Sequence, residues 1–503
     1  MRYSATGHLL IVEPSARQLD QLRRYPWAGK VTACLSRDFS DFSDAAPDDL
    51  RIQSARVIDL QGWLGRFQVR AVDPNDQPVI GLSTKGSGHF DLVIDCGATA
   101  LMERGVLPFG YFRTEPGQDL GPALEDAAAL IGNFSKPRYF QYQPEICAHH
   151  SYGQSGCTRC LDVCGAAAIQ SNGQRIEVNP YLCQGCGSCT LACPTGALSF
   201  VEPQRDVLLG ALRQRAAHGV DQAGPLLVSN QAPSEPGAPD PHLVVEPLSA
   251  FGEELWIAAL ALGFSSVVLQ AHRPLDSLSR KLLDEKLAEV RRMLAAFGLA
   301  DSAVMLIEAA VPLPELPEPA ANAQQTRVAF EASVQSALSG QTKRELLNAG
   351  LQALAAGREV QTAVQLDEGA VLGEILVDPQ RCTLCSSCAK LCPTGAIDYS
   401  EREQPGTARL SFLEALCVQC GICASGCPEQ AIELAPRLGP GDIRGQRRVV
   451  ASSPMAECTD CGAQFVGEKL LKRTLGRLAE HGATEAALEQ AVRCPRCRAI
   501  RVG

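Results

Sequence analysis

The feature that most constrains this chain is a cysteine pattern that occurs three times in full. The pattern is Cys-x₂-Cys-x₂-Cys-x₃-Cys followed by Pro, and its copies begin at Cys183, Cys382 and Cys417. A fourth copy, which begins at Cys157, keeps only the last three cysteines of the pattern. Cysteines this close together on one loop can place three thiolates around a single metal centre. We therefore expect metal-binding loops at these four positions.

The cysteine content separates this chain from secreted proteins that are held together by disulfides. Of its 503 residues, 22 are cysteine, but disulfide frameworks are typical of short secreted domains. The first apolar stretch, Leu9–Val12, is too short for a secretory signal. The longest apolar run, Leu255 to Leu269, is interrupted by Gly263 and falls short of the roughly 20 residues that span a bilayer. We therefore expect reduced, metal-binding thiols in a cytoplasmic protein without a membrane span.

The complete pattern resembles the ligand run of bacterial ferredoxins that bind two [4Fe–4S] clusters. In that family the first three cysteines of a run bind one cluster, and the fourth binds the other cluster of the pair. The resemblance implies two ferredoxin-like double-cluster modules, at residues 141–202 and 373–437, and four [4Fe–4S] clusters in the chain. Zinc or purely structural thiols are the alternatives, and three full copies argue against both. Gly185, Gly187 and Gly421, beside the ligands, are expected to adopt unusual φ values.

The ligand crossing of the ferredoxins divides the predicted ligands into four sets. Three sets are Cys183, Cys186, Cys189 and Cys164; Cys417, Cys420, Cys423 and Cys392; and Cys382, Cys385, Cys388 and Cys427. The fourth set contains Cys157, Cys160 and Cys193 and needs one more ligand. We name them after one member each, as the Cys189, Cys423, Cys388 and Cys160 sets.

The missing ligand of the fourth set is the main departure from the ferredoxin pattern. Position 154, where the first cysteine of this copy should stand, is Gln154. The nearest upstream cysteine is Cys147, which we expect to be the fourth ligand across an inserted loop. His149 or His150 as the ligand, and a three-iron cluster or an open site, are the alternatives. The same copy has Gly165 in place of the Pro that follows the other copies, and we expect a modest change of geometry there.

Outside the modules, strand-like and helical patterns alternate, which predicts a multidomain protein of the α/β and α+β classes. Residues 1–140 are expected to form a mixed α/β domain, and the absence of G-x-G-x-x-G there gives no support for a dinucleotide site. Residues 203–310 alternate strand and helix, which predicts a parallel sheet with right-handed crossovers. Residues 311–372 are expected to contain a Pro-rich linker, at 311–319, and a helical pair, at 325–357.

Apolar periodicity locates individual elements in the two α/β domains. The predicted strands are 9–12, 31–35, 56–60, 67–72, 91–94, 226–229, 242–247, 266–270 and 304–307, and the predicted helices are 15–25, 119–131, 207–215, 253–262 and 279–297. The last of these helices has the clearest pattern and is followed by Gly298 as a stop signal. Cys34 and Cys96 fall in apolar, strand-like segments and are expected to be small buried hydrophobic residues.

The last segment, residues 438–503, carries four cysteines as two Cys-x₂-Cys pairs. They are Cys458, Cys461, Cys494 and Cys497. Four thiolates in this arrangement suit a structural Zn²⁺ or a rubredoxin-like iron. We expect zinc in a small zinc-ribbon-like tail, with iron, a fifth cluster or free thiols as alternatives. A closed site of this kind would fold the tail without catalysing a reaction, because the tail holds little apolar core.

Residues 203–310 are similar to a second family. The run Val245-Glu-Pro-Leu-Ser-Ala-Phe-Gly-Glu-Glu-Leu255, then Gly263-Phe-Ser-Ser-Val-Val268 and a helix that ends at Phe297, resembles the delta-type electron-transfer domain of methyl-viologen-reducing hydrogenases. That domain is also fused to heterodisulfide reductase subunits and carries cysteines for a [2Fe–2S] cluster. This stretch has no cysteine, so the resemblance implies the fold without its cluster.

The whole arrangement is also similar to multi-cluster ferredoxin proteins of proteobacteria that are found beside respiratory formate dehydrogenases. The segments that carry this likeness are Phe109-Gly-Tyr-Phe112 and Gly156-Cys-Thr-Arg-Cys-Leu-Asp-Val-Cys164. It implies a dehydrogenase, such as a formate dehydrogenase, as one redox partner.

Together these patterns predict an iron–sulfur electron-transfer protein, or oxidoreductase subunit, that passes single electrons between redox partner proteins. Lys and Arg number 46 against 56 Asp and Glu, a net charge of −10. This balance argues against nucleic acid as a partner and suits docking to a basic patch on a protein. Nothing beyond cysteine ligation marks a catalytic residue. A flavin- or nicotinamide-dependent enzyme fed by the clusters is the first alternative, and a scaffold with structural clusters is the second.

Overall fold

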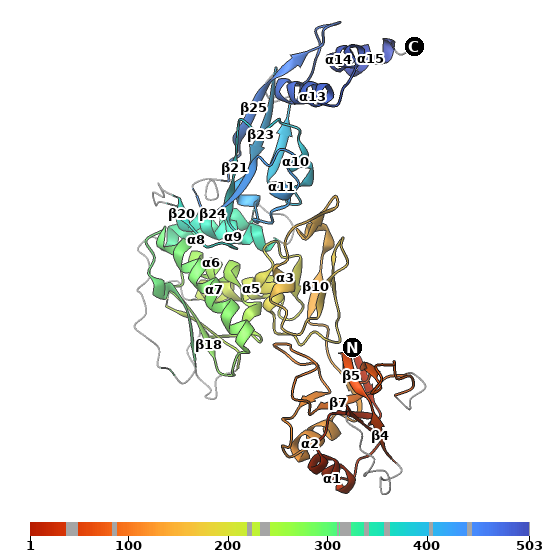
Figure 1. The fold of residues 1–503 in the computed structure, drawn as a ribbon. Coiled ribbons are helices and arrows are strands. Elements are labelled where there is room, and N and C mark those ends of the chain that lie inside the picture. The colour runs from red at the N-terminus through yellow and green to blue at the C-terminus, as the bar shows by residue number, and fades with distance from the viewer. Residues whose placement is uncertain are drawn as a thin grey trace.

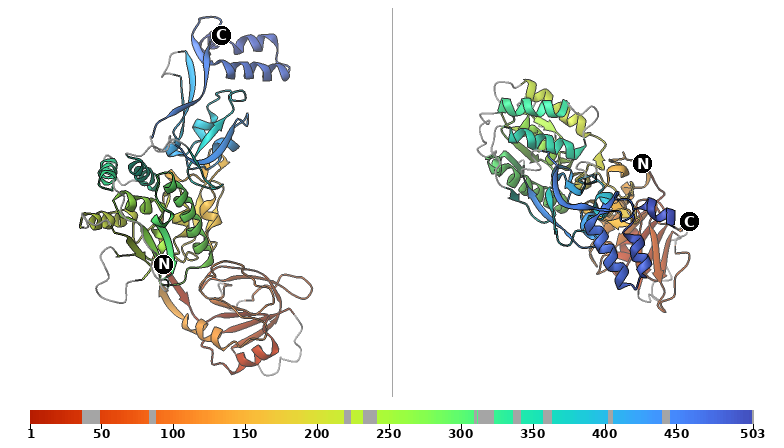
Figure 2. Two further views of the ribbon diagram at one scale, coloured as in Figure 1. Left: turned by 90° about the vertical axis from the view of Figure 1, so that its left-hand side faces the viewer. Right: turned by 90° about the horizontal axis from the view of Figure 1, so that it is seen from above.

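The computed structural model describes residues 1–36, 49–82, 88–218, 224–231, 242–308, 311, 323–335, 342–356, 363–401, 406–439 and 445–501. The molecule is elongated, with the N-terminal domain at one end and the C-terminal tail at the other (Figure 1, Figure 2). The first module and the α/β domain of residues 203–308 lie side by side between these ends, and the second module connects them to the tail. Among the described residues, no helix is long and apolar enough to cross a membrane.

The N-terminal domain is built on a five-stranded parallel sheet. Its strands are β2 (Leu9–Val12), β3 (Val31–Leu35), β4 (Leu50–Ser54), β7 (Leu92–Asp95) and β8 (Tyr111–Arg113). Their order, β4-β3-β2-β7-β8, matches the first five strands of a doubly wound fold. In this fold successive strands are added first on one side of β2 and then, from β7 onward, on its other side. All four residues of β2 are buried, as expected for an uninterrupted apolar run in the centre of a parallel sheet.

The remaining elements of the N-terminal domain lie outside this sheet, and their strands form two separate antiparallel pairs, β1 with β9 and β5 with β6. They are β1 (Arg2–Ala5), α1 (Ala16–Arg24), β5 (Arg56–Gln61), β6 (Gln68–Val72), α2 (Gly121–Ala129) and β9 (Gly132–Ser135). Helix α1 begins where Ser15 and Gln18 form a capping box, and Leu19 on its inner face belongs to the core. Cys34 and Cys96 are fully buried, so their prediction as core residues is confirmed.

The α/β domain has the regular alternation of strands and helices that its sequence predicts. Its elements are α5 (Arg205–His218), β16 (Leu226–Ser229), β17 (His242–Val244), α6 (Glu253–Ala261), β18 (Val267–Ala271), α7 (Ser277–Ala295) and β19 (Val304–Glu308). The four strands form one sheet in the order β17-β16-β18-β19, and all its pairs are parallel. The predicted parallel sheet is therefore confirmed.

A helical pair packs on this domain and buries α6 completely. The pair consists of α8 (Ala323–Gln335) and α9 (Lys343–Ala355), where the sequence predicts two helices. Every residue of α6 is buried, because α6 lies between the sheet on one side and α8 and α9 on the other. The predicted Pro-rich linker at 311–319 lies outside the described residues, apart from Val311.

Both modules combine strands with single-turn helices. The first contains β10 (Phe140–Tyr142), β11 (His150–Ser151), β12 (Gln154–Ser155), α3 (Arg159–Asp162), β13 (Ile169–Ser171), β14 (Ile176–Val178), α4 (Ser188–Ala192) and β15 (Leu198–Phe200). The second contains β20 (Val364–Gln365), β21 (Gly373–Val377), α10 (Ser387–Leu391), β22 (Ile397–Ser400), β23 (Thr407–Phe412), α11 (Ile422–Ser425) and β24 (Ile432–Leu438). Cysteines contribute to the small apolar core of each module.

The tail is joined to the second module through a shared sheet. Strand β25 (Arg448–Glu457) pairs with β23 on one edge and with β26 (Gln464–Gly467) on the other, both antiparallel. Helices α13 (Glu468–Glu480), α14 (Glu485–Ala491) and α15 (Pro495–Arg501) follow, and they project at the end of the molecule (Figure 2). The position of α13 is therefore fixed by the sheet of the second module.

The start of α9 contacts both modules through two neighbouring buried side chains. Lys343 donates hydrogen bonds to two backbone oxygens of α4 in the first module, at 3.2 and 2.6 Å. Arg344 donates to the backbone oxygens of Ala415 and Cys417 in the second module, both at 2.7 Å. Helix α9 therefore fixes both modules against the α/β domain.

Lys343 also forms ion pairs with two buried carboxylates of α6. Its Nζ lies 3.1 Å from Glu253 Oε1 and 3.8 Å from Glu254 Oε2. Burial lowers the pKa of Lys343, but the two carboxylates outweigh burial and the net shift is upward. Burial raises the pKa of Glu253, but Lys343 and Lys286 outweigh it and the net shift is downward. Lys343 and Glu253 are therefore both ionised at neutral pH.

Replacing Lys343 with Met is expected to destabilise the protein by about 3–5 kcal/mol, because it removes the ion-pair partner of two buried carboxylates. The measurement is anaerobic urea unfolding at pH 7, followed by tryptophan fluorescence. The lowered pKa of Glu253 adds stability at neutral pH that is lost as the pH falls through that lowered value. The control is Lys281→Met on α7, whose side chain is 74% exposed. Equal unfolding midpoints for Lys343→Met and the wild type would contradict this account.

Candidate metal centres

The structure brings the members of each predicted ligand set close together. Cys382, Cys385, Cys388 and Cys427 line one cavity, and Cys164, Cys183, Cys186 and Cys189 line another. In each set, burial is the largest cause that raises the pKa of the thiol after which the set is named, and the other three thiols of the set raise it further. In the Cys160 set, the fourth of these thiols is Cys147. A bound cation would relieve this repulsion between thiolates. The donor chemistry therefore fits an iron–sulfur group.

Three of the four cysteine loops share one backbone conformation. The residue before the short helix is left-handed in each, namely Gly187 (φ 78°), Ser386 (φ 63°) and Gly421 (φ 81°). Gly185 also has a positive φ, of 77°, so the unusual values predicted for the three glycines are confirmed. The incomplete copy differs, because Thr158 at the corresponding place has a φ of −114°.

Backbone N–H groups point at the sulfur atoms of the cysteines that cross between sets. The N···Sγ distances are 3.2 Å from Ala168 to Cys164, 3.5 Å from Leu198 to Cys193 and 3.4 Å from Ala431 to Cys427. Hydrogen bonds to sulfur ligands help to set the reduction potential of a cluster. No sequence signal marks these donors, because every residue except Pro offers a backbone N–H.

Cys147 lies beside the Cys160 set. It directly follows the 3-10 turn Pro144–Ile146, and its backbone N–H donates to the backbone oxygen of Pro144. Burial raises the pKa of the Cys147 thiol, and Cys193 and Cys157 add to the increase. The structure thus places this thiol where the incomplete copy needs a ligand.

The two neighbouring histidines have other partners. The ring nitrogens of His149 lie 2.9 Å from the backbone oxygen of Cys157 and 2.7 Å from Ser171 Oγ. His150 stands in β11, and its Nε2 lies 3.1 Å from the backbone N of Gly153. Both ring nitrogens of His149 are therefore engaged in holding the loop between Cys147 and Cys157.

Other domains cover the outer side of the Cys189 set. Lys136 of the N-terminal domain donates a hydrogen bond to the backbone oxygen of Cys183 at 2.6 Å. Gln184 donates to the backbone oxygen of Leu107 at 2.5 Å. Helix α4 also contacts the turn that precedes α6. The loop around this set is therefore packed against two domains.

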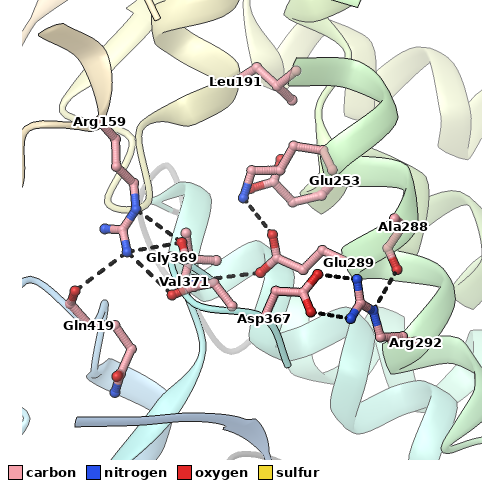
Figure 3. Close-up of polar contacts among 12 residues, drawn as sticks. Arg159, Leu191, Glu253, Ala288, Glu289, Arg292, Asp367, Gly369, Val371 and Gln419 are labelled. Atoms are coloured by element: carbon pink, nitrogen blue, oxygen red, sulfur yellow. Dashed lines mark hydrogen bonds and ion pairs between the residues drawn. The ribbon is translucent and has the colours of Figure 1, made fainter. Parts of the chain in front are cut away.

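Arg159 joins the two modules beside a predicted ligand of the first. Its guanidinium donates hydrogen bonds to the backbone oxygens of Val418, at 3.1 Å, and Gly369, at 3.2 Å. Its Nη1 also lies 3.6 Å from Cys157 Sγ. Figure 3 shows the side chain reaching from the first module towards the backbone of the second at Gln419. The arginine thus places a positive charge where the modules meet.

The backbones of the two modules also approach closely at this junction. A Cβ added to Gly156 would lie 2.5 Å from Cγ1 of Ile422, so a side chain at this position would separate the modules. Burial raises the pKa of the Cys420 thiol, and Cys157 of the other module is among the thiols that add to the increase. The Cys160 and Cys423 sets are therefore neighbours across the junction.

The four tail cysteines come together as one group of possible metal ligands. The Sγ atoms of Cys458, Cys461, Cys494 and Cys497 all lie within 4.8 Å of one another. The backbone N–H of Cys494, whose N lies 3.2 Å from Cys458 Sγ, lowers the pKa of the Cys458 thiol to about 6. Hydrogen bonds with Cys461 and Cys494 raise the pKa of Cys497 to about 12. This pattern suits a site that binds a cation through thiolates.

Comparison with known families finds 4Fe-4S domains at both modules. The family described as 4Fe-4S dicluster domain matches residues 381–431, and the family described as 4Fe-4S binding domain matches residues 176–199. An uncharacterized ferredoxin from Methanocaldococcus jannaschii is 36% identical over 58 residues, which cover 12% of this chain and 32% of that protein. The match spans about a third of that relative's length. The chain therefore carries ferredoxin-type 4Fe-4S domains, which support an iron–sulfur electron-transfer role.

Cys147→Ser is expected to lower the iron content by about four atoms per chain, or to leave a three-iron cluster, because a hydroxyl replaces a thiolate ligand. His149→Gln is the matched variant and should keep the wild-type iron content, since an amide can replace the two hydrogen bonds of the ring. Iron analysis and EPR of the anaerobically purified proteins measure both. Iron loss in His149→Gln alone would identify the histidine as the ligand instead.

Replacing Cys458 and Cys494 with Ala is expected to remove about one metal ion per chain, because two of four thiolates are lost. Elemental analysis identifies the ion, and limited proteolysis should cleave the tail faster in the variant. Cys34→Ala, in the N-terminal core, is the cysteine control and should retain the ion. Unchanged metal content in the double variant would rule out a tail site.

Proposed function

We propose that this protein is an electron-transfer protein, or the electron-transfer subunit of an oxidoreductase, with four [4Fe–4S] clusters. The ligands would be the four named sets, with Cys147 completing the Cys160 set. When bound, such clusters take up and release single electrons, and four thiolate ligands leave no open position for a substrate. The function then depends on how the chain places the four sets relative to one another.

The observation that carries this proposal is the contiguity of the four thiol sets across both modules. Neighbouring sets lie close enough for their thiols to interact electrostatically. In each neighbouring pair, a thiol of one set raises the pKa of a thiol of the other, in addition to the effect of burial. The pairs are Cys160 and Cys189, Cys157 and Cys420, and Cys388 and Cys423. The sets therefore follow one another in the order Cys189, Cys160, Cys423, Cys388.

Arg159 has a specific role in this arrangement. It donates hydrogen bonds to the backbone of the second module and approaches Cys157 Sγ. A fixed positive charge favours the reduced, more negative state of a nearby centre. Arg159 would thus make reduction easier at the junction between the modules.

The partners follow from the resemblances. The likeness to proteins found beside respiratory formate dehydrogenases favours a dehydrogenase, such as formate dehydrogenase, as one partner. The α/β domain, if delta-type in origin, would position the first module rather than carry electrons, since residues 203–310 contain no cysteine.

The strand order of the N-terminal domain favours a second candidate, a flavin- or nicotinamide-dependent oxidoreductase. Open α/β sheets bind ligands where the strand order reverses. In this domain Glu13 follows β2 and Gly97 follows β7, and a Cβ on Gly97 would lie 3.9 Å from the Cβ of Glu13. The sequence after β2 lacks a Gly-rich phosphate loop, so the electron-transfer proposal has more support.

The test is metal, sulfide and flavin analysis of anaerobically purified full-length protein, followed by EPR during stepwise reduction. We expect about 16 irons beyond the tail site, no flavin, and reduced-cluster signals that interact magnetically. In Arg159→Gln the magnetic interaction between the reduced clusters of the two modules should weaken, while the iron content stays unchanged. Bound flavin would favour the enzyme, and clusters that resist reduction would leave only a structural role.

A further inference from the structure

We infer that the groove between α13 and the second module is a docking site for an acidic redox protein that exchanges electrons at the Cys388 set. This inference rests on the proposed electron-transfer function. It says where on this protein one redox partner docks and that the docking surface of that partner is acidic.

The groove lies directly against the Cys388 set. It has a volume of about 890 Å³ and is lined by Pro379–Thr383 and Pro428–Gln430 of the second module on one side and by α13 on the other. Cys382, a member of the set, is part of its lining. A protein seated in this groove would contact a predicted cluster ligand with no domain between them.

The groove is strongly basic. Its charged side chains are Arg381, Lys469, Lys472, Arg473 and Glu429, four cations against one anion. Glu429 pairs with Arg473 at 3.1 Å and with Arg477 at 3.3 Å, so the lining as a whole has a net charge of 4 − 1 = +3. Steps of three and four residues place the α13 cations on one face of the helix.

Contacts between α13 and the module hold this basic face in place. Lys469 Nζ donates a hydrogen bond to the backbone oxygen of Pro379 at 2.8 Å. Lys472 keeps a side chain that is 77% exposed, and its carboxylate partner, Glu468 at 3.4 Å, is on its own helix. The groove therefore presents cations to solvent on a rigid support.

The tail that carries the basic groove is positively charged, whereas the rest of the chain is negatively charged. Residues 445–501 hold ten Lys and Arg and six Asp and Glu, which is 10 − 6 = +4. The remainder therefore carries −10 − 4 = −14. Such a distribution repels an acidic protein over most of the surface and attracts it to the tail, which steers encounter towards this end. At the opposite end, the N-terminal domain packs against the Cys189 set.

The test uses full-length, cluster-loaded protein and a small acidic 2[4Fe–4S] ferredoxin as the probe. The variant is Lys469→Glu with Lys472→Glu. We expect the wild type to bind the probe and to exchange electrons with it at rates that fall with added salt. In the double variant the binding constant and the bimolecular rate at low salt should each fall about tenfold, and the salt dependence should flatten. Calorimetry measures binding, and stopped-flow absorbance measures the rate.

Two further variants separate docking from folding. Lys472→Glu alone leaves the contact between Lys469 and Pro379 intact and should give a loss of about threefold. Lys281→Glu on α7 is the matched exposed-lysine control and should match the wild type. All variants should contain the same iron and be reduced to the same extent by dithionite, because that small reductant needs no docking surface.

The outcomes distinguish this inference from the proposed function. Clusters that dithionite cannot reduce would remove the electron-transfer function and the docking site with it. Normal reduction by dithionite, with no measurable binding of the ferredoxin or equal affinities for wild type and double variant, would overturn the docking site alone. Tighter binding of duplex DNA than of the ferredoxin, lost in the double variant, would also overturn it and assign the groove to nucleic acid.

Discussion

The arrangement of this protein depends on the contacts of two neighbouring basic residues at the start of α9. Lys343 binds backbone oxygens of α4, and Arg344 binds backbone oxygens around Cys417. Positive charge at a helix N-terminus opposes the helix dipole, so helix stability does not explain these residues. Their charges are balanced by the carboxylates of α6 and by the carbonyls that they bind. The same pair of residues therefore joins the core of the α/β domain to both groups of thiols.

Each module has only a small apolar core of its own. The strands of the first module are only two or three residues long, and cysteines make up part of the core of each module. Ser386 adopts the same left-handed conformation as Gly187 and Gly421, although a side chain makes that conformation unfavourable. Such a cost is tolerated where another interaction fixes the loop. Metal binding by deprotonated thiols is an interaction of that kind, because its free energy adds to the free energy of folding.

Sequence patterns located the elements that have a strong apolar signal and missed those that depend on pairing. The runs that form β2, β3 and β16 were found with their observed bounds, because buried parallel strands are continuously apolar. Strand β4 was missed, since only its first residue is buried. Strand β25 contains Pro454 and small polar residues, and forms because β23 and β26 pair with its two edges. The strand order of the N-terminal sheet likewise follows from non-local pairing that no local pattern encodes.

By itself, the sequence determined the chemistry of this protein: the repeated cysteine spacing selects soft metal centres, and a spacing of two or three residues leaves the loop few ways to present its thiols. It also determined the strand and helix content of the α/β domain through apolar periodicity. Only the tertiary structure decided how the two modules meet, because it places Cys157 of the first module close to Cys420 of the second. It also decided that α13 places its cations beside Cys382. Each of these is a contact between segments that lie far apart in the chain. Buried hydrogen bonds and shared sheets fix such contacts, and no local sequence pattern identifies the partners.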